Sequence, residues 1–255
     1  MRGTTVQRVF GGIKADLYLP PKSLTAAPCR LVLVGDGRSL FDILPQVLSP
    51  LEEKMAAAGQ GLVLVGLDSG EQRDADYTPW PARGFDVDYP DFPGKADDYL
   101  RRLDEVLLPA LRAELPVSAD PADTGILGFS LSGLLATYAP FRSANFGWSM
   151  SISGSNWYDG FIPFLAGHDP VGDCRFFLSY GRAEGAGKYS MHRDAGQSAE
   201  EAAAALRTRL GAERVTVISD SGRHSNKRVS RFTTALGWFW NGGRLPEQDE
   251  IHSKL

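Results

Sequence analysis

The chain has 255 residues and a formal net charge of −4, and 43% of its residues are hydrophobic and 23% charged. This balance is ordinary for a globular α/β domain, and it lacks the excess of basic residues typical of nucleic-acid-binding proteins. No apolar run is long enough to cross a membrane. No apolar signal-peptide core follows Arg2, so we expect a cytoplasmic protein.

Short apolar runs alternate along the chain with segments of helical spacing, which predicts an α/β fold. The predicted strands are residues 6–10, 13–19, 31–34, 61–67, 124–127, 148–152, 175–180 and 214–219. The predicted helices are residues 48–58, 96–115, 130–138, 199–210 and 225–240, and Pro109 is expected to kink the second of them. Such alternation indicates a mostly parallel central sheet with helices on both faces.

Residues 68–96 interrupt the alternation with a long segment rich in Asp, Pro, Gly and aromatic residues. Its aromatic content argues against disorder, so we expect an ordered loop over the strand ends. No repeat, low-complexity tract or domain boundary is visible. We therefore expect a single domain over residues 1–255, with residues 244–255 forming a loose polar tail.

The most informative stretch is Gly128-Phe129-Ser130-Leu131-Ser132-Gly133, between a predicted strand and a predicted helix. In a G-x-S-x-G nucleophile elbow, a tight turn exposes a reactive serine at the end of a strand. Gly128 and Ser130 fit this pattern, whereas Ser132 stands where the second glycine is usual. Alternatively, a serine at such a turn acts only as a helix N-cap.

His224 and Glu184 follow the last two predicted strands, and both strands end at the same edge of a parallel sheet as the strand before Ser130. The chain order Ser–acid–His is that of α/β-hydrolases, with the serine as nucleophile, the histidine as general base and the acid orienting the imidazole. The rival histidines lie in turns, polar stretches or the tail, and two aspartates compete with Glu184. These rivals are His168, His192, His252, Asp173 and Asp194.

An oxyanion hole requires the backbone N–H that follows the nucleophile and a second N–H from the loop after an early strand. Leu131 supplies the first, and Gly37 or Arg38 is the expected source of the second. Several aromatic side chains on loops near the serine are expected to line a substrate pocket, with core packing as the alternative. These are Tyr77, Trp80, Trp157 and Tyr158. Arg73, and also Arg38 or Lys95, are candidates to meet an anionic group of the substrate, with solvated surface charge as the alternative.

Cys29 and Cys174 are far apart in the sequence, and each lies beside an apolar run. We expect buried free thiols rather than a disulfide. No Cys/His cluster has the spacing of metal ligands, so neither a metal nor a cofactor is expected.

Several segments together resemble the putative esterase family of α/β-hydrolases, which includes enterochelin (siderophore) esterase-like proteins. The resemblance lies in residues 34–41, 76–80, 94–100, 128–134, 151–158, 178–184 and 222–224. It implies Ser130 as nucleophile, His224 as base and Glu184 as acid, with the oxyanion hole at Leu131 and the loop of residues 36–38. Ser132 and Lys95 depart from the family pattern, since glycine is common at both positions.

The sequence thus predicts a serine hydrolase that cleaves carboxylic esters of a small molecule through an acyl-enzyme, with siderophore-like or aryl esters as candidate substrates. A thioesterase or an acyltransferase would use the same triad. A non-catalytic binding protein on the hydrolase scaffold is the alternative from a different class, because fold alone does not establish catalysis. The sequence does not define the natural substrate or the oligomeric state.

Overall fold

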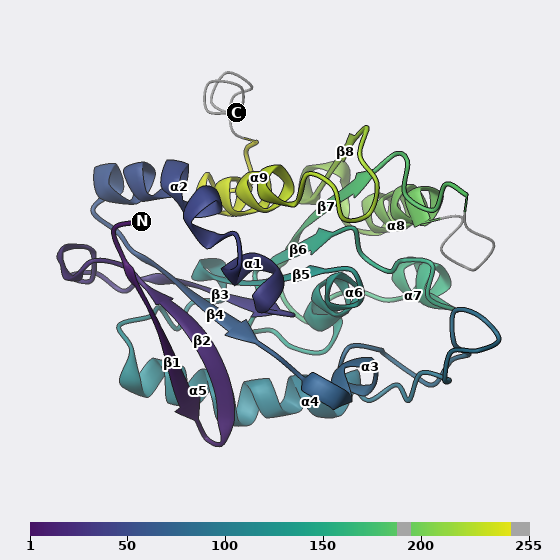
Figure 1. Ribbon diagram of the computed structural model, residues 1–255, viewed down its shortest axis with the longest axis horizontal. Coiled ribbons are helices and arrows are strands. Elements are labelled where there is room, and N and C mark those ends of the chain that lie inside the picture. The colour runs from purple at the N-terminus through teal and green to yellow at the C-terminus, as the bar shows by residue number, and fades with distance from the viewer. Residues whose placement is uncertain (188–194, 246–255) are drawn as a thin grey trace.

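The computed structural model describes residues 1–187 and 195–245, and its centre is an eight-stranded sheet (Figure 1). The spatial order is β1-β2-β4-β3-β5-β6-β7-β8. The pairs β1–β2 and β2–β4 are antiparallel and all other pairs are parallel, which confirms the expected mostly parallel sheet. The strands are β1 Thr4–Phe10, β2 Ile13–Leu19, β3 Arg30–Gly35, β4 Leu62–Leu67, β5 Thr124–Phe129, β6 Trp148–Ile152, β7 Arg175–Gly181 and β8 Val215–Asp220.

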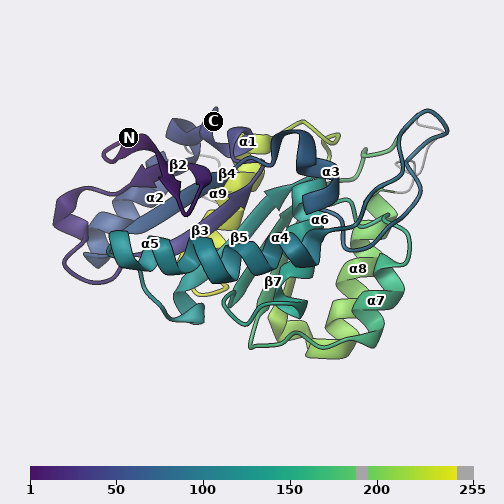
Figure 2. The ribbon, with the colours of Figure 1, turned by 90° about the horizontal axis from the view of Figure 1, so that it is seen from below.

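Helices cover both faces of the sheet and thereby bury its central strands on both sides. The helices are α1 Arg38–Phe41, α2 Leu44–Ala58, α3 Arg73–Asp76, α4 Ala96–Arg102, α5 Leu108–Glu114, α6 Leu131–Tyr138, α7 Phe161–Gly167, α8 Ala195–Leu210 and α9 Arg228–Trp240. Helices α2 and α9 pack on one face, and α4 to α8 pack on the other (Figure 2). Each layer closes its own hydrophobic cluster against the sheet, as an α/β fold requires.

The first two strands form the predicted hairpin around Gly11 and Gly12. Both glycines have positive φ, +54° and +86°, which is the backbone of a tight two-residue hairpin turn. Strand β1 is almost wholly exposed, whereas β2 buries Ala15, Leu17 and Tyr18. The hairpin therefore forms the antiparallel edge of an otherwise parallel sheet.

The long helix predicted over residues 96–115 keeps helical backbone from Ala96 to Glu114, but its hydrogen bonding changes just before Pro109. Helix α4 continues into a π-helical turn at Leu103–Leu107, and α5 then begins with Pro109 in its first turn. Proline has no N–H to donate to the preceding turn, so the helical hydrogen-bond ladder is broken there. Helices α2 and α8 begin earlier than expected, at Leu44 and Ala195, whereas α9 begins later, at Arg228.

The segment between β4 and α4 is ordered, as expected. A bridge joins Ala82 to Phe92, and the N–H of Lys95 donates to the carbonyl of Ala75. Within residues 1–187 and 195–245, no helix is both long and apolar enough to cross a bilayer. Apart from its first two residues, the expected tail lies outside the described residues.

Candidate active site

The turn between β5 and α6 holds Ser130 in a backbone conformation that non-glycine residues rarely adopt, with φ of +63° and ψ of −121°. Its N–H donates to the carbonyl of Ile152, and its carbonyl accepts from Gly133. A Cβ at position 128 would lie 2.0 Å from the carbonyl oxygen of Ser132, so only glycine fits there. Neighbouring backbone thus maintains the strained conformation, as is common at functional sites.

Ser132, the departure from the glycine pattern, completes this turn through its hydroxyl. The N–H of Phe129 donates to Ser132 Oγ at 2.9 Å. The hydroxyl has acceptors in the carbonyl of Phe129 at 2.8 Å and the carbonyl of Gly35 at 3.2 Å. The paired residues of β3 and β5 end at Val34 and Leu127, so this hydroxyl bridges the two strands where their ladder has stopped.

Ser130, His224 and Glu184 form one continuous hydrogen-bonded chain across the carboxyl ends of β5, β8 and β7. His224 Nε2 lies 3.0 Å from Ser130 Oγ, and His224 Nδ1 lies 3.0 Å from Glu184 Oε2. The Phe129 ring packs against the imidazole with a centroid separation of 4.8 Å. The three side chains therefore have the mutual geometry of a nucleophile, a base and an orienting acid.

The Glu184 side chain is only 2% exposed, and its carboxylate accepts hydrogen bonds from several protein groups. Burial alone raises the pKa of Glu184, but hydrogen bonds from His224, the Gly181 N–H and the Ser153 hydroxyl outweigh it and lower that pKa. The Gly181 N–H lies 2.6 Å and Ser153 Oγ 2.7 Å from Oε1. Oε1 is thus occupied, and Oε2 faces the imidazole as an ionised acceptor.

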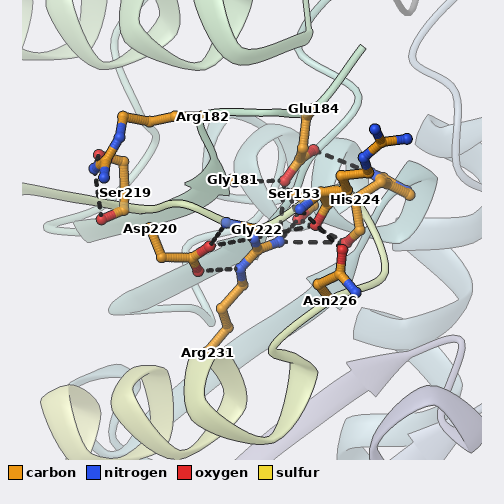
Figure 3. Close-up of polar contacts among 11 residues, drawn as sticks. Ser153, Gly181, Arg182, Glu184, Ser219, Asp220, Gly222, His224, Asn226 and Arg231 are labelled. Carbon is orange, nitrogen blue, oxygen red and sulfur yellow. Dashed lines mark hydrogen bonds and ion pairs between the residues drawn. The ribbon is translucent and has the colours of Figure 1, made fainter. Parts of the chain in front are cut away.

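Two residues of this network were not anticipated from the sequence. Ser153, directly after β6, has φ of +49° and places its hydroxyl on Glu184. Arg231, in α9, donates from Nη1 to Glu184 Oε1 at 3.0 Å (Figure 3). The positive φ of a serine gives no sequence signal, and an arginine near the start of an amphipathic helix resembles a surface charge.

The two expected oxyanion donors on the β3 loop differ in their bonding. The N–H of Gly37 donates to the carbonyl of Leu67 at 2.8 Å, so it is already engaged. Arg38 is the first residue of α1, where a helix leaves backbone N–H groups without helical partners. Leu131 is likewise the first residue of α6. Of the expected donors, Gly37 is thus already bonded, while Arg38 and Leu131 each begin a helix.

Arg73 and Tyr77 hold this loop rather than lining an open pocket. Asp36 has φ of +49°, and its carboxylate forms a bidentate ion pair with Arg73 at 2.8 and 2.7 Å. Its N–H donates to Tyr77 Oη at 3.1 Å. Burial, with the nearby Asp36 carboxylate, raises the pKa of Tyr77, so its hydroxyl stays neutral. The expected contact of Arg73 with an anionic substrate group is replaced by this internal ion pair.

A cavity of about 130 Å³ opens beside Ser130 and His224. It is lined by Ser130, Ser153, Trp157, Glu184, Gly185, Ala195 and His224. Of the four aromatic residues predicted to border the serine, Trp157 is the one that lines this cavity. The cavity thus combines the triad with one indole wall.

The other three aromatic side chains pack elsewhere, contrary to the expectation that all four line the pocket. Tyr77 is fully buried and Tyr158 is 2% exposed. Trp80 packs against Tyr158 and against rings of α6 and α7, and its Nε1 donates to the carbonyl of Asp159. These rings anchor the long loop to the helices, because burying aromatic surface is strongly favourable.

The rival site residues lie apart from the triad or outside the described residues. His168 Nδ1 lies 2.9 Å from the carbonyl of Phe164, and Asp173 pairs with Arg214. His192, Asp194 and His252 fall in segments that the structure does not describe. Among the described residues, no group of His, Cys, Asp and Glu is arranged to hold a metal, and Cys29 and Cys174 are free and buried.

A mostly parallel sheet with a strained serine between a strand and a helix, and a histidine and an acid on later strand ends, defines an α/β-hydrolase. Comparison with known families is consistent with this class. The family model described as "Putative esterase" matches residues 8–235. The chain belongs to this esterase family, as the resemblance predicted.

A curated relative and several solved structures are similar to the chain over most of its length. "Uncharacterized protein YbbA" from Bacillus subtilis (strain 168) is 30% identical over 251 residues, covering 96% of this chain and 99% of the relative. The siderophore hydrolase EstA from Aspergillus nidulans has a TM-score of 0.74 at 19% identity, covering 95% of each chain. The enterobactin esterase FES from Shigella flexneri has a TM-score of 0.69 at 18% identity, covering 95% of this chain and 58% of that one.

Proposed function

We propose that the protein is a serine esterase that hydrolyses carboxylic esters through an acyl-enzyme intermediate. The observation that carries this proposal is the hydrogen-bonded chain Ser130–His224–Glu184, with both links at 3.0 Å. Membership of the esterase family supports ester hydrolysis as the reaction class. The strained backbone of Ser130 supports its role as the nucleophile.

In the acylation step, Ser130 Oγ attacks the ester carbonyl carbon while its proton passes to His224 Nε2. Glu184 accepts the hydrogen bond of Nδ1–H, which leaves the Nε2 lone pair facing the serine and stabilises the imidazolium that forms. The carbonyl oxygen becomes an oxyanion, which accepts hydrogen bonds from the N–H groups of Leu131 and Arg38. The tetrahedral intermediate then collapses, and His224 gives its proton to the departing alcohol.

Deacylation repeats these steps with water in place of the serine hydroxyl. His224 removes a proton from the water, whose oxygen attacks the acyl carbon and forms a second oxyanion. Collapse releases the carboxylic acid and returns the proton to Ser130 Oγ. No group beyond this chain and water is required for the cycle to balance.

The cavity and the relatives support a proposal for the substrate class. A volume of about 130 Å³ is small beside common ligand pockets of roughly 300–1,000 Å³, so it suits a short acyl group rather than a whole ligand. Trp157 offers an apolar wall to an aryl group. Because solved relatives are siderophore hydrolases and an enterobactin esterase, siderophore-like aryl esters are the first candidates to test.

The decisive experiment measures release of p-nitrophenol from p-nitrophenyl acetate and labelling by a fluorophosphonate probe. Wild type should turn over and be labelled, whereas Ser130→Ala should do neither. The matched control is Ser118→Ala, which removes a buried hydroxyl whose partner is the N–H of Asp120. Labelling of Ser130→Ala equal to that of wild type would exclude Ser130 as the nucleophile.

Thioester substrates and acyl acceptors added to this assay separate the alternatives. A thioesterase or an acyltransferase forms the same acyl-enzyme, so it is labelled but transfers the acyl group preferentially from a thioester or to an added acceptor. A binding protein on the hydrolase scaffold gives neither turnover nor labelling with the wild-type chain. A panel of acyl, aryl and siderophore esters then ranks substrates by kcat/KM.

A further inference from the structure

Arg231 lies in the first turn of α9, and its side chain is only 2% exposed. Figure 3 shows it extending from the helix toward the loops that follow β6, β7 and β8. A buried guanidinium is costly unless its donors and its charge are satisfied. Its partners therefore reveal what it stabilises.

The guanidinium of Arg231 contacts every loop that builds the acid and base part of the site. Its Nε and Nη2 atoms form a fork on the Asp220 carboxylate at 2.7 and 2.9 Å. Its Nη1 atom donates to Glu184 Oε1 at 3.0 Å and to Ser153 Oγ at 2.5 Å. Both terminal nitrogens also reach backbone, with Nη1 at 3.3 Å from the carbonyl of His224 and Nη2 at 3.2 Å from that of Arg223.

Two glycines leave the space that this side chain occupies. A Cβ at position 181 would lie 2.5 Å from Arg231 Nη2, and one at position 222 would lie 2.7 Å from Asp220 Oδ1. The Gly181 N–H also donates to Glu184 Oε1. The strand ends are thus built around the guanidinium, which makes it part of the site rather than a peripheral ion pair.

The arrangement divides the Glu184 carboxylate into two differently bound oxygens. Oε1 is taken by Arg231, Ser153 and the Gly181 N–H, and Oε2 is left for His224 Nδ1. At the same time, the positive charge of Arg231 offsets the negative charge of Asp220. Burial alone raises the pKa of Asp220, but the hydrogen bond and charge of Arg231 outweigh it and lower that pKa. The pKa of Glu184 is lowered as well, so the carboxylates of Glu184 and Asp220 are both ionised at neutral pH.

We infer that Arg231 is a positioning residue for the proposed esterase reaction: it orients Glu184 toward His224, and with Asp220 it sets the charge that the imidazole meets. This inference rests on the proposed function for its catalytic meaning. An arginine that only stabilised the β8 loop would need Asp220 and the loop carbonyls alone. Its Nη1 bond to the acid is what couples it to the base.

The charge balance around His224 gives the inference a specific signature. The groups that face the imidazole, directly or through Glu184, are the carboxylates of Glu184 and Asp220, the guanidinium of Arg231 and the Phe129 ring. Lys227 also acts on Asp220 through its charge, and Arg223 precedes the histidine as an exposed residue. Removing the Arg231 charge favours the imidazolium, and removing the Asp220 charge disfavours it.

The test compares Arg231→Gln, Arg231→Lys and Asp220→Asn by the pH profile of kcat/KM for p-nitrophenyl acetate. We expect the acid limb to move to higher pH in R231Q, to lower pH in D220N, and to stay in place in R231K, which keeps the charge. R231Q and R231K should lose about 10- to 100-fold in kcat because Glu184 is misplaced, with KM within about twofold because Arg231 does not line the cavity. The matched control is Arg209→Gln, which removes an exposed bidentate pair with Asp169 and should leave the profile unchanged.

NMR titration of the His224 imidazole in the same variants, assigned by comparison with His224→Ala, measures the shift without turnover. If wild type lacks esterase activity, the proposed function fails while this titration still tests the coupling. If R231Q does not fold, D220N carries the test, because it keeps Arg231 and alters a partly exposed partner. A folded D220N with an unmoved titration and acid limb would overturn the inference, as would a folded R231Q with wild-type kcat.

Discussion

Removing the Ser132 hydroxyl should destabilise the protein, although glycine is the usual residue of the motif at that position. The hydroxyl accepts a hydrogen bond from the Phe129 N–H at 2.9 Å, and the Ser132 residue is only 1% exposed. Ser132→Ala leaves that N–H without a partner in a buried turn, which costs about 1–3 kcal/mol. Ser132→Gly adds a glycine to the first turn of α6, for a further loss of up to about 1 kcal/mol.

The assay is guanidinium unfolding at constant m, in which a lower midpoint reports the lost free energy of unfolding. The matched control is Thr25→Ala, which also removes a hydroxyl bonded to a backbone carbonyl, but at an exposed site. Water replaces that bond, so the control should change the free energy by less than about 0.5 kcal/mol. The order of stability should be wild type, then S132A, then S132G.

A midpoint for S132A equal to that of wild type would refute the bridging role of the hydroxyl. A second outcome probes the same contact from the other strand. A Cβ at position 35 would lie 2.8 Å from Ser132 Cβ, so Gly35→Ala should be strongly destabilising alone and much less so when combined with S132G. Additive effects of the two substitutions would contradict this steric account.

Two further predictions concern the oxyanion loop and the acid. Tyr77→Phe removes the acceptor of the Asp36 N–H and should lower kcat for p-nitrophenyl acetate about threefold to tenfold with little change in KM; an unchanged kcat would show that this bond does not position Arg38. Because the pKa of Glu184 is lowered in the folded state, its contribution to stability is present above the unfolded value of about 4.3 and is lost as the pH falls through the lower folded value. The stability gap between wild type and Glu184→Gln, measured by denaturant unfolding, should therefore be constant at neutral pH and shrink in acid; a gap that does not vary with pH would contradict it.

The sequence predicted the features that local pattern and topology determine. Apolar runs predict the strands, and the rule that parallel strands end at one edge of the sheet predicts that residues 130, 184 and 224 lie together. The order of the strands in the sheet was not predicted, because pairing between segments distant in sequence leaves no local trace. A kink was expected at Pro109, because proline acts through the backbone of its own turn, and the π-helical turn at Leu103–Leu107 directly precedes α5, which carries that proline.

The direction of a loop side chain is what the sequence did not reveal. Tyr77, Trp80 and Tyr158 belong to the expected loops but point into the fold, since nothing in an irregular segment encodes which side faces the core. Arg73 was expected to meet a substrate anion and instead meets Asp36, a carboxylate of the same chain. For such residues, chemistry predicted the kind of partner but not its identity.

The charged groups around the His224 imidazole are the carboxylates of Glu184 and Asp220 and the guanidinium of Arg231. With neutral His224, the two carboxylates and the Arg231 cation sum to a single negative charge, and Glu184 and Arg231 are nearly sealed from water. In the proposed reaction, proton transfer from Ser130 would make the cluster neutral, while the new negative charge would lie on the substrate oxygen near the Leu131 and Arg38 N–H groups. A cluster without Arg231 would hold two negative charges, which favour a positively charged imidazole. The buried arginine thus offsets part of the negative charge beside His224 while it leaves Glu184 Oε2 to accept from Nδ1.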